Sequence, residues 1–577
     1  MIAELNPGLI LILGALLIPL VPQIARGAIS LALPLVGLAQ LLLLPRGEAG
    51  QIALFGYQLV TLRIDDLSFV FGLIFLIAAF LASIYALHVK GWVEPMAAQM
   101  YAGSAIGAVF AGDLITLFVF WEITAITSVF LIWARRSERS FDTGMRYLIV
   151  QVGSGVLLLS GVLLYVHQTG SVAFDVIAQV TTQNWQDASA ATWLILIAFG
   201  IKAAFPFLHN WLQDAYPEAT PSGTVWLSAF TTKLAIYALA RGFPGSDLLV
   251  PIGIVMAIFP LFYAAVENDL RRVLAYALNN QLGFMVIGVG IGTDLAIAGA
   301  AAQAFCHILY KALLYMSVGA VLFRVGTAKA TELGGLARAM PWTCAFCIIG
   351  ALSISAPLFA GFISKSLIIS AAMKEGYFAA WIVMLFASAG VFLTTGLRVP
   401  YAAFFQGRAP REVAEAPNNM LAAMGLVSAL SLGLGLYPTA LYALLPNGVT
   451  YEPYTLEHVV TQMQLLAFAA LAFALLVARG FYPRDEARTL VDFDWFYRRL
   501  GYNLGSTLLI LGRSMINTIG DAGRAAILRV EQNISRTHNP DGMLARTWST
   551  GVMAFLATAM LAGYLVIFYA PALVGAG

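Results

Sequence analysis

Charged residues are scarce in this chain of 577 residues: they make up 11% of it, whereas apolar residues make up 60%. A soluble domain averages about 25% charged and roughly 45–50% apolar residues, and the mean hydropathy here is +0.83. This composition excludes a soluble enzyme, a nucleic-acid-binding protein and a disordered scaffold. It predicts an all-α polytopic membrane protein, whose lipid partner is the bilayer itself.

Cysteine and redox motifs are also nearly missing. Cys306, Cys344 and Cys347 all lie in apolar stretches, so no disulfide framework is expected. Cys344 and Cys347 are spaced as CxxC but have no second pair, which favours packing over a metal site. The sequence contains no four-cysteine cluster, glycine-rich dinucleotide loop or haem motif. We therefore expect no metal and no cofactor, and no redox chemistry in this chain.

The apolar residues fall into about 14–16 candidate transmembrane helices. A span needs roughly 17–25 apolar residues. The first run lacks a basic segment and an A-x-A cleavage site, so it is interpreted as a span and not as a cleaved signal. The candidates are 8–24, 28–45, 67–88, 98–112, 114–133, 145–167, 192–212, 222–243, 249–267, 272–291, 295–323, 341–373, 378–405, 418–437, 462–479 and 548–572.

The stretch 341–373 decides the topology, because it consists of two short apolar pieces on either side of "SISAPLFAGFISK". Counted as one helix broken near Pro357, it puts most basic loop residues on one side, which the positive-inside rule makes cytoplasmic. The N-terminus is then external. That side holds Arg26, Lys90, Arg135, Arg136, Arg139, Arg146, Arg271, Arg272, Arg324, Lys329, Arg338, Arg408 and Arg411, and the other holds Arg46, Arg63, Arg241 and Lys374.

The longest polar region, 480–547, also falls on the predicted cytoplasmic side. Within it, apolar residues recur every three or four positions, and Arg498, Arg513, Arg524 and Arg529 interrupt them too often for a span. This pattern is typical of an amphipathic helix along the membrane face. Such a surface helix would either pack on its own subunit or brace a neighbouring one.

Four of the seven lysines lie within predicted spans: Lys202, Lys233, Lys311 and Lys365. A charge at the middle of the bilayer costs at least about 2.5–3.5 kcal/mol on insertion scales, so four such residues are unexpected as packing accidents. Lysine can lose its proton when buried, whereas arginine in practice cannot. The choice of lysine therefore indicates a proton relay.

The only acid at the middle of a predicted span is Glu122, and we expect it to pair with a membrane lysine. The alternative is a lone carboxylate that fixes helix packing. Lys202 precedes Pro206 in "GIKAAFPFLHNW", where the proline kinks the helix and frees a backbone carbonyl. Lys233 follows two threonines in the next helix.

His307 and Lys311 are four residues apart and so share one face of a helix. Histidine can accept a proton on one nitrogen and donate from the other, which suits a relay; the alternative is a hydrogen-bonded core histidine. Lys365 follows the break at Pro357 much as Lys202 lies beside the break at Pro206. His209, Asp214 and Glu218 could feed protons into the seventh helix, although a solvated loop is the favoured interpretation.

Arg398 is the one arginine predicted inside a span. We interpret it as lying near a membrane boundary or as a fixed counter-charge to the lysines.

The two broken helices, 7 and 12, suggest an internal repeat. Helices 4–8 and helices 9–13 each contain one broken helix followed or preceded by membrane cations. A unit of five crossings is inverted in its tandem copy. The predicted organisation is helices 1–3 (1–97), a first inverted repeat (98–243), a second inverted repeat (249–405), helices 14–15 (418–479), the cytoplasmic surface helix (480–547) and a last span (548–577).

These residues carry a family resemblance over roughly 65–440. The segments "FWE", "IKAAFPFLHNWLQDAYPEATP", "TTKLAIYALAR", "ENDLRRVLAYALNNQLGFM", "HILYKALLYMSVGAV" and "GFISK" resemble the antiporter-like subunits of Mrp-type cation/proton antiporters, respiratory complex I and membrane-bound hydrogenases. The resemblance implies two inverted repeats with a proton half-channel each. It implies that Glu122 and Lys202 form the ion pair of helices 5 and 7, that Lys311 connects the halves, and that Lys365 ends the second.

Three features bear on the subfamily. Lys233 resembles the lysine of the D-type antiporter subunits and of the mid-arm complex I subunits. The surface helix resembles that of the distal complex I subunit, and Gln303 stands where a second histidine is common. The resemblance implies one subunit of a hetero-oligomeric Mrp-type Na⁺(K⁺)/H⁺ antiporter in a bacterial or archaeal cytoplasmic membrane, and not an enzyme. The alternative is a proton-pumping subunit of a redox-driven complex. A membrane transferase would need acidic or histidine clusters in large loops, which this sequence lacks, and a self-sufficient carrier is a further alternative.

Overall fold

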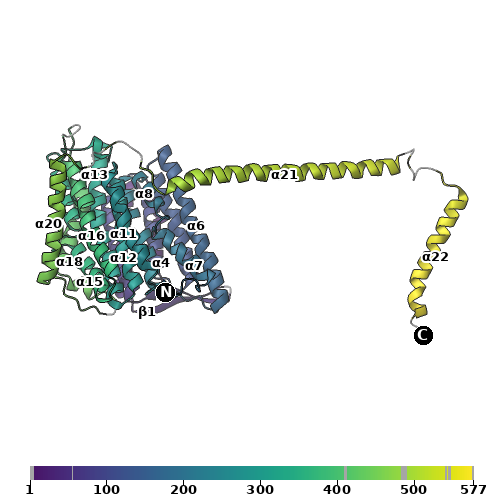
Figure 1. Ribbon diagram of the computed structural model, residues 1–577, viewed down its shortest axis with the longest axis horizontal. Helices are drawn as coiled ribbons and strands as arrows, with labels where there is room; N and C mark the ends of the chain where they lie inside the picture. The colour runs from purple at the N-terminus through teal and green to yellow at the C-terminus, as the bar shows by residue number, and fades with distance from the viewer. Residues whose placement is uncertain are drawn as a thin grey trace. The chain divides into compact units, whose positions relative to one another are not determined.

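The computed structural model of the protein describes residues 5–574, apart from 55, 408–411, 447, 483–485, 487–489, 540–541 and 543–546. The chain divides into two units, Met1–Asp492 and Phe493–Gly577. Figure 1 shows the first unit as a bundle of upright helices and the second as two separate helices. The predicted relay residues all belong to the first unit.

The first unit is built almost wholly of helices, and several begin at a side chain that caps the first turn, such as Asp65, Asp113 and Ser137. The helices are α1 (Pro7–Ala15), α2 (Gln23–Leu43), α3 (Asp66–Tyr85), α4 (Val93–Val109), α5 (Leu114–Trp133), α6 (Glu138–Thr169), α7 (Ala190–Lys202), α8 (Asn210–Glu218), α9 (Pro221–Ala229), α10 (Thr231–Gly242), α11 (Leu249–Val266), α12 (Leu270–Ile291), α13 (Asp294–Val325), α14 (Pro341–Leu352), α15 (Ala360–Lys374), α16 (Phe378–Val391), α17 (Arg398–Pro400), α18 (Asn418–Leu436), α19 (Thr439–Tyr442) and α20 (Leu456–Ala478).

Eleven helices in the described part of the chain are long and apolar enough to cross a membrane, and shorter apolar helices at Pro7–Leu20, Ala190–Lys202 and Pro341–Leu352 add to them. The prediction of an all-α polytopic membrane protein is confirmed. Each of the sixteen predicted spans coincides with a helix or a broken pair of helices. The predicted breaks in helices 7 and 12 are confirmed as α7/α8 and α14/α15.

The breaks are irregular backbone inside a packed bundle. Ala204 and Phe207 in the first break, and Leu358 in the second, adopt positive φ values of 59°, 70° and 71°. Positive φ is unfavourable for residues other than glycine, and non-helical backbone at membrane depth is tolerated only inside protein or beside a cavity. The fourth helix of each predicted five-helix group is thus broken, as an inverted repeat requires. The repeat and its boundaries stay predictions.

Three features were not predicted. Strands β1 (Gly47–Leu54) and β2 (Tyr57–Ile64) form an antiparallel hairpin in a segment interpreted as a loop, and Val60 of β2 donates its N–H to the Asp113 carboxylate over 2.8 Å. The eighth span is broken at Phe230, between α9 and α10. Two π-helical turns, Phe392–Leu397 and Tyr401–Phe405, flank α17.

Ion pairs place four of the loop arginines on two faces of the bundle. Arg139 and Arg146 pair with Glu218 and Asp214 on the face where α5 ends and α6 begins. On the opposite face, Arg63 pairs with Asp175 and Arg241 pairs with Asp65. The prediction had separated these two sets of arginines in the same way. Arg408 and Arg411 lie outside the described residues.

The second unit contains α21 (Asp494–His538) and α22 (Thr550–Val574). The predicted amphipathic helix exists as α21, a helix of 45 residues in which no residue is buried. At 1.5 Å per residue it is about 65 Å long. The last predicted span corresponds to α22, whose apolar window also lacks buried residues.

Candidate functional site

Lys202 is the last residue of α7 and points into the bundle just before the break. Its side chain is fully buried, and Nζ donates a hydrogen bond of 2.7 Å to the backbone carbonyl of Trp121 on α5. The same Nζ lies 4.3 Å from the centre of the Trp121 ring. A carbonyl and an aromatic face both stabilise an ammonium group. The break therefore places this lysine where its proton has partners in the protein.

Glu122 is the residue next to Trp121 on α5 and is half-buried. Its carboxylate occupies space left by Gly155 of α6, because a Cβ atom at position 155 would overlap Oε1. Oε1 has no hydrogen-bond partner in the described part of the protein, and Lys202 is the cation that acts on it electrostatically. The predicted partners are thus neighbours, but the lysine bonds the carbonyl of Trp121.

Lys233 lies one turn into α10, close to the unpredicted break at Phe230. It is fully buried, and Nζ donates a hydrogen bond of 2.6 Å to the carbonyl of Ser228 in α9. The break turns that carbonyl toward the lysine. Lys202 and Lys233 therefore both donate to backbone carbonyls, but only the acceptor of Lys233 lies beside a helix break, since Trp121 belongs to the continuous helix α5.

His307 and Lys311 lie on α13, the long helix at the centre of the bundle. Both are buried, and the two imidazole nitrogens and the lysine Nζ have no hydrogen-bond partner among the described residues. Buried polar groups are nearly always satisfied by protein or by water. Water is thus the expected partner here, and Lys233 and Lys365 are the charged neighbours of this pair.

Lys365 follows the break in the twelfth span and is 3% exposed. Its Nζ donates to Ser355 Oγ over 2.8 Å and lies 3.5 Å from Ser388 Oγ. It also faces Phe284 of α12, 5.4 Å from the ring centre. In contrast to Lys202 and Lys233, this lysine is held by side-chain hydroxyls.

The structure therefore joins the six predicted relay residues into two groups. Lys233, His307, Lys311 and Lys365 are connected by electrostatic interactions across α10, α13 and α15. Glu122 and Lys202 form a second group between α5 and α7. Whether these residues carry protons stays a prediction.

Two pairs of hydroxyl groups lie between helices of the first half, and they were not predicted. Ser128 and Tyr147 lie 2.8 Å apart, and Thr231 lies 2.7 Å from the hydroxyl of Tyr101. These hydroxyl groups are uncharged, unlike the lysines, glutamate and histidine from which the relay was predicted. Tyr101 and Tyr147, near the beginning of the predicted spans 98–112 and 145–167, were the available signal.

Gln303, one turn before His307, belongs to a second polar network. Its amide nitrogen donates to Gln281 over 2.9 Å and to the Tyr310 hydroxyl over 3.1 Å, and Ser364 donates to its oxygen over 2.6 Å. The glutamine therefore ties α13 to α12 and α15. It stands where the resemblance would place a second histidine, and it cannot carry a proton charge.

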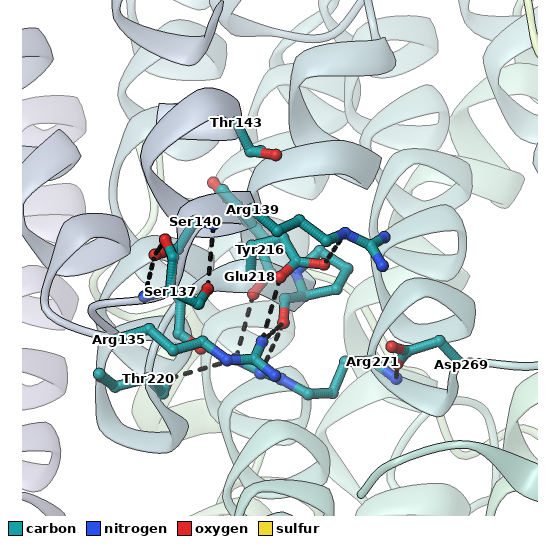
Figure 2. A network of polar contacts seen from close by, with 12 residues as sticks. Arg135, Ser137, Arg139, Ser140, Thr143, Tyr216, Glu218, Thr220, Asp269 and Arg271 are labelled. Carbon is teal, nitrogen blue, oxygen red and sulfur yellow. Dashed lines mark hydrogen bonds and ion pairs between the residues drawn. The ribbon is translucent and has the colours of Figure 1, made fainter. Parts of the chain in front are cut away.

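The polar residues around α8 are less exposed than the sequence predicted. The solvated-loop interpretation is wrong for His209 and Glu218, which are 3% and 6% exposed. Figure 2 shows Glu218 between Arg135 and Arg139, at 3.4 and 2.8 Å. Arg271 donates to the carbonyls of residues 217 and 219 beside it. Because α8 packs against α6 and α12, its polar residues are covered.

His209 lies 3.3 Å from the carboxylate of Asp492, and Asp214 pairs with Arg146 and Arg272. Arg398 is buried and donates to carbonyls where α11 ends, including Glu267 at 2.6 Å. This agrees with the boundary interpretation of Arg398. No group of three or more metal-binding side chains occurs among the described residues, and the three cysteines are buried and unpaired.

The chain matches a known protein family over slightly less than half of its length. The family described as "NADH:quinone oxidoreductase/Mrp antiporter, TM" matches residues 111–394. The NADH-quinone oxidoreductase subunit N of Desulforudis audaxviator is 30% identical over 466 residues, which cover 74% of this chain and 90% of that protein. This chain belongs to the same family. The match contains all six predicted relay residues, and the predicted resemblance is confirmed.

Other members of the family are similar over shorter parts. Hydrogenase-4 component B of Escherichia coli is 29% identical over 428 residues, covering 66% of this chain and 63% of that protein. The D-type subunit of the Na⁺/H⁺ antiporter of Alkalihalophilus pseudofirmus is 31% identical over 288 residues, covering 48% and 58%. The chain thus spans less than two thirds of the length of these two relatives.

Two solved structures share the fold. A chain of the Mrp complex from Dietzia sp. aligns with a TM-score of 0.67 and 22% identity. The alignment covers 82% of this chain and 99% of that chain. The membrane-bound sulfane sulfur reductase, described as an archaeal respiratory membrane complex, aligns with 96% of this chain and 99% of its own, with a TM-score of 0.69 and 24% identity. At these identities the likeness concerns the fold.

Proposed function

We propose that this chain moves protons across a prokaryotic cytoplasmic membrane as one subunit of a larger complex. The observation that carries this proposal is the buried set of four lysines and one histidine, which lies on α7, α10, α13 and α15 beside the helix breaks. Membership of the antiporter-like family supports it. Buried cations without a transport role would be costly, since each disfavours insertion.

The geometry suggests how charge moves. A proton that leaves Lys202 Nζ removes the cation beside Glu122, and one that arrives restores it. Two unit charges several ångströms apart interact by roughly a few kcal/mol at an effective dielectric constant of about 20. That is comparable with the roughly 2.3 kcal/mol needed to move one charge against about 100 mV. Loss of a proton at one residue can therefore drive uptake at the next.

In the second half, Lys311 and His307 exchange protons through the water expected around them, and Lys365 exchanges with the far face. Ser355 accepts a hydrogen bond from the lysine when it is charged and can donate one when it is neutral. We place the face of Arg135, Arg139 and Glu218 in the cytoplasm and the N-terminus outside, as the positive-inside rule indicates.

The assembly that contains this chain has two candidates. The first is a Mrp-type Na⁺(K⁺)/H⁺ antiporter, which the likeness to the D-type antiporter protein supports. The second is a redox-driven complex, favoured by the alignment with 96% of this chain in the sulfane sulfur reductase structure, against 82% in the Mrp structure. Purification from native membranes separates them, because the partners would be small antiporter subunits or iron–sulfur subunits.

The proposed transport is tested in vesicles that contain the whole complex, with a pH-sensitive dye inside. Glu122→Gln and Lys202→Ala should each abolish proton movement while the complex still assembles. Lys329→Ala is the matched control, because that lysine forms an exposed pair with Glu332. Full proton movement in either membrane variant would refute the relay.

A further inference from the structure

A cavity of about 510 Å³ opens beside Lys365, and part of its wall comes from α20. This helix lies outside both five-helix groups and outside the residues matched by the family. The part of the cavity wall that α20 provides therefore lies outside the predicted relay. The residues that line the cavity and can exchange or bond protons are Ser355, Lys365, Ser366, Ser370, Lys374, Glu457, His458, Thr461 and Gln462.

Exposure increases along the cavity. Lys365 is buried, Gln462 and His458 are half-buried, and Glu457 and Lys374 are exposed. The volume has room for on the order of ten waters, since each occupies about 30 Å³ in the liquid. The cavity thus leads by polar groups from a buried lysine toward the face that carries Lys374.

Hydrogen bonds hold α20 beside the cavity. Gln462 donates from Nε2 to the carbonyl of Ser355 over 3.1 Å, and Ser355 is the hydroxyl that holds Lys365. One turn earlier on the helix, His458 Nδ1 lies 3.3 Å from the Tyr451 hydroxyl, which lies 2.7 Å from Ser370 of α15. Two polar contacts therefore connect α20 to the helix of Lys365.

Tyr451 sets the orientation of the histidine. Its ring stacks on the His458 imidazole with centres 6.0 Å apart, and burial raises the pKa of the Tyr451 hydroxyl, so this group stays neutral. With Nδ1 beside Tyr451, Nε2 is the nitrogen that remains for proton exchange. Histidine is the side chain whose ordinary pKa lies nearest to physiological pH.

We propose that His458 receives the proton that Lys365 releases and passes it to the outer face. The N–H bond at Lys365 Nζ breaks, water in the cavity carries the proton, and an N–H bond forms at His458 Nε2. The lysine is then neutral and the imidazole charged, until the imidazole loses the proton outside. The charged groups facing this site are Lys365, Lys374 and Glu457. The inference rests on the proposed function.

Chemical rescue tests the role of His458 in vesicles containing the whole complex. His458→Ala should slow proton movement at least about tenfold, and imidazole added on the outer side should restore it, because the cavity admits a small ring. Imidazole should not restore Lys365→Ala. Gln464→Ala, an exposed position on the same helix, is the control. Normal movement in His458→Ala, or a loss that imidazole does not reverse, would overturn the proposal.

Thiol labelling tests the cavity independently of transport. Ser370→Cys should react with a small membrane-impermeant reagent from the outer side, whereas Ser431→Cys should not, because Ser431 is fully buried. The native cysteines are buried as well. Absence of labelling at position 370 would refute an open path. If the unaltered complex moves no protons while position 370 is labelled, the proposed function fails and the cavity stands.

Discussion

The two halves of the bundle hold their lysines in different ways. In the first half, Lys202 and Lys233 donate to backbone carbonyls, and Glu122 supplies a carboxylate. In the second half, Lys365 is held by serine hydroxyls, and Lys311 has no partner in the described protein. A carboxylate can hold a charged lysine, whereas hydroxyls and water accommodate both its charged and neutral forms. Under the proposed function, the first half would therefore switch and the second would conduct.

Among the substitutions that test this difference between the halves, Lys365→Arg should have the largest effect on proton movement. Arginine keeps the charge but does not release a proton, so proton movement should fall by about fiftyfold if the second half conducts. Dye-based proton uptake in vesicles measures this, with Lys329→Arg as the control. Unchanged uptake would make Lys365 a fixed charge.

Gly155→Ala tests the first half alone. The added Cβ would overlap the Glu122 carboxylate, and forcing a side chain from its place costs about 1–3 kcal/mol. Proton movement should fall about tenfold. Gly153→Ala on the same helix meets no atom within 4 Å and serves as the matched control. Equal activity of the two variants would show that the position of Glu122 does not matter.

Ser355→Ala should have the smallest effect of the three, a loss of about fivefold. The lost hydrogen bond is to a charged group, but Ser388 and water replace part of it, leaving on the order of 1 kcal/mol. Initial rates of proton uptake measure the loss. Ser388→Ala should be milder, because its hydroxyl lies 3.5 Å from Lys365 Nζ. The reverse order would contradict the assignment of Ser355 as the main partner.

The sequence was sufficient to predict the spans, because twenty apolar residues have few alternatives to a membrane helix. Pro206 and the pair of short apolar pieces around Pro357 also revealed both broken helices. The break at Phe230 has no proline or glycine within it, so no local sequence signal predicted it. The hairpin of β1 and β2 was missed because half of its residues face outward without a regular alternation.

The site was predictable only in part. Lysine and glutamate in apolar surroundings stand out by their cost, and all six relay candidates lie in the first unit as expected. Their acceptors do not stand out, since Lys202 bonds a carbonyl that any residue at position 121 would supply. Likewise, the burial of Glu218 depends on the packing of α8 against α6 and α12, which loop composition does not encode.

Glu122 lies at the rim of the bundle. Val119 and Ile126, three residues before it and four after it on the same side of α5, are 47% and 49% exposed. Bulk water would not screen this carboxylate well once lipid or protein covers that rim. The protonation state of Glu122 should therefore respond to a charged group on any molecule that binds at this rim.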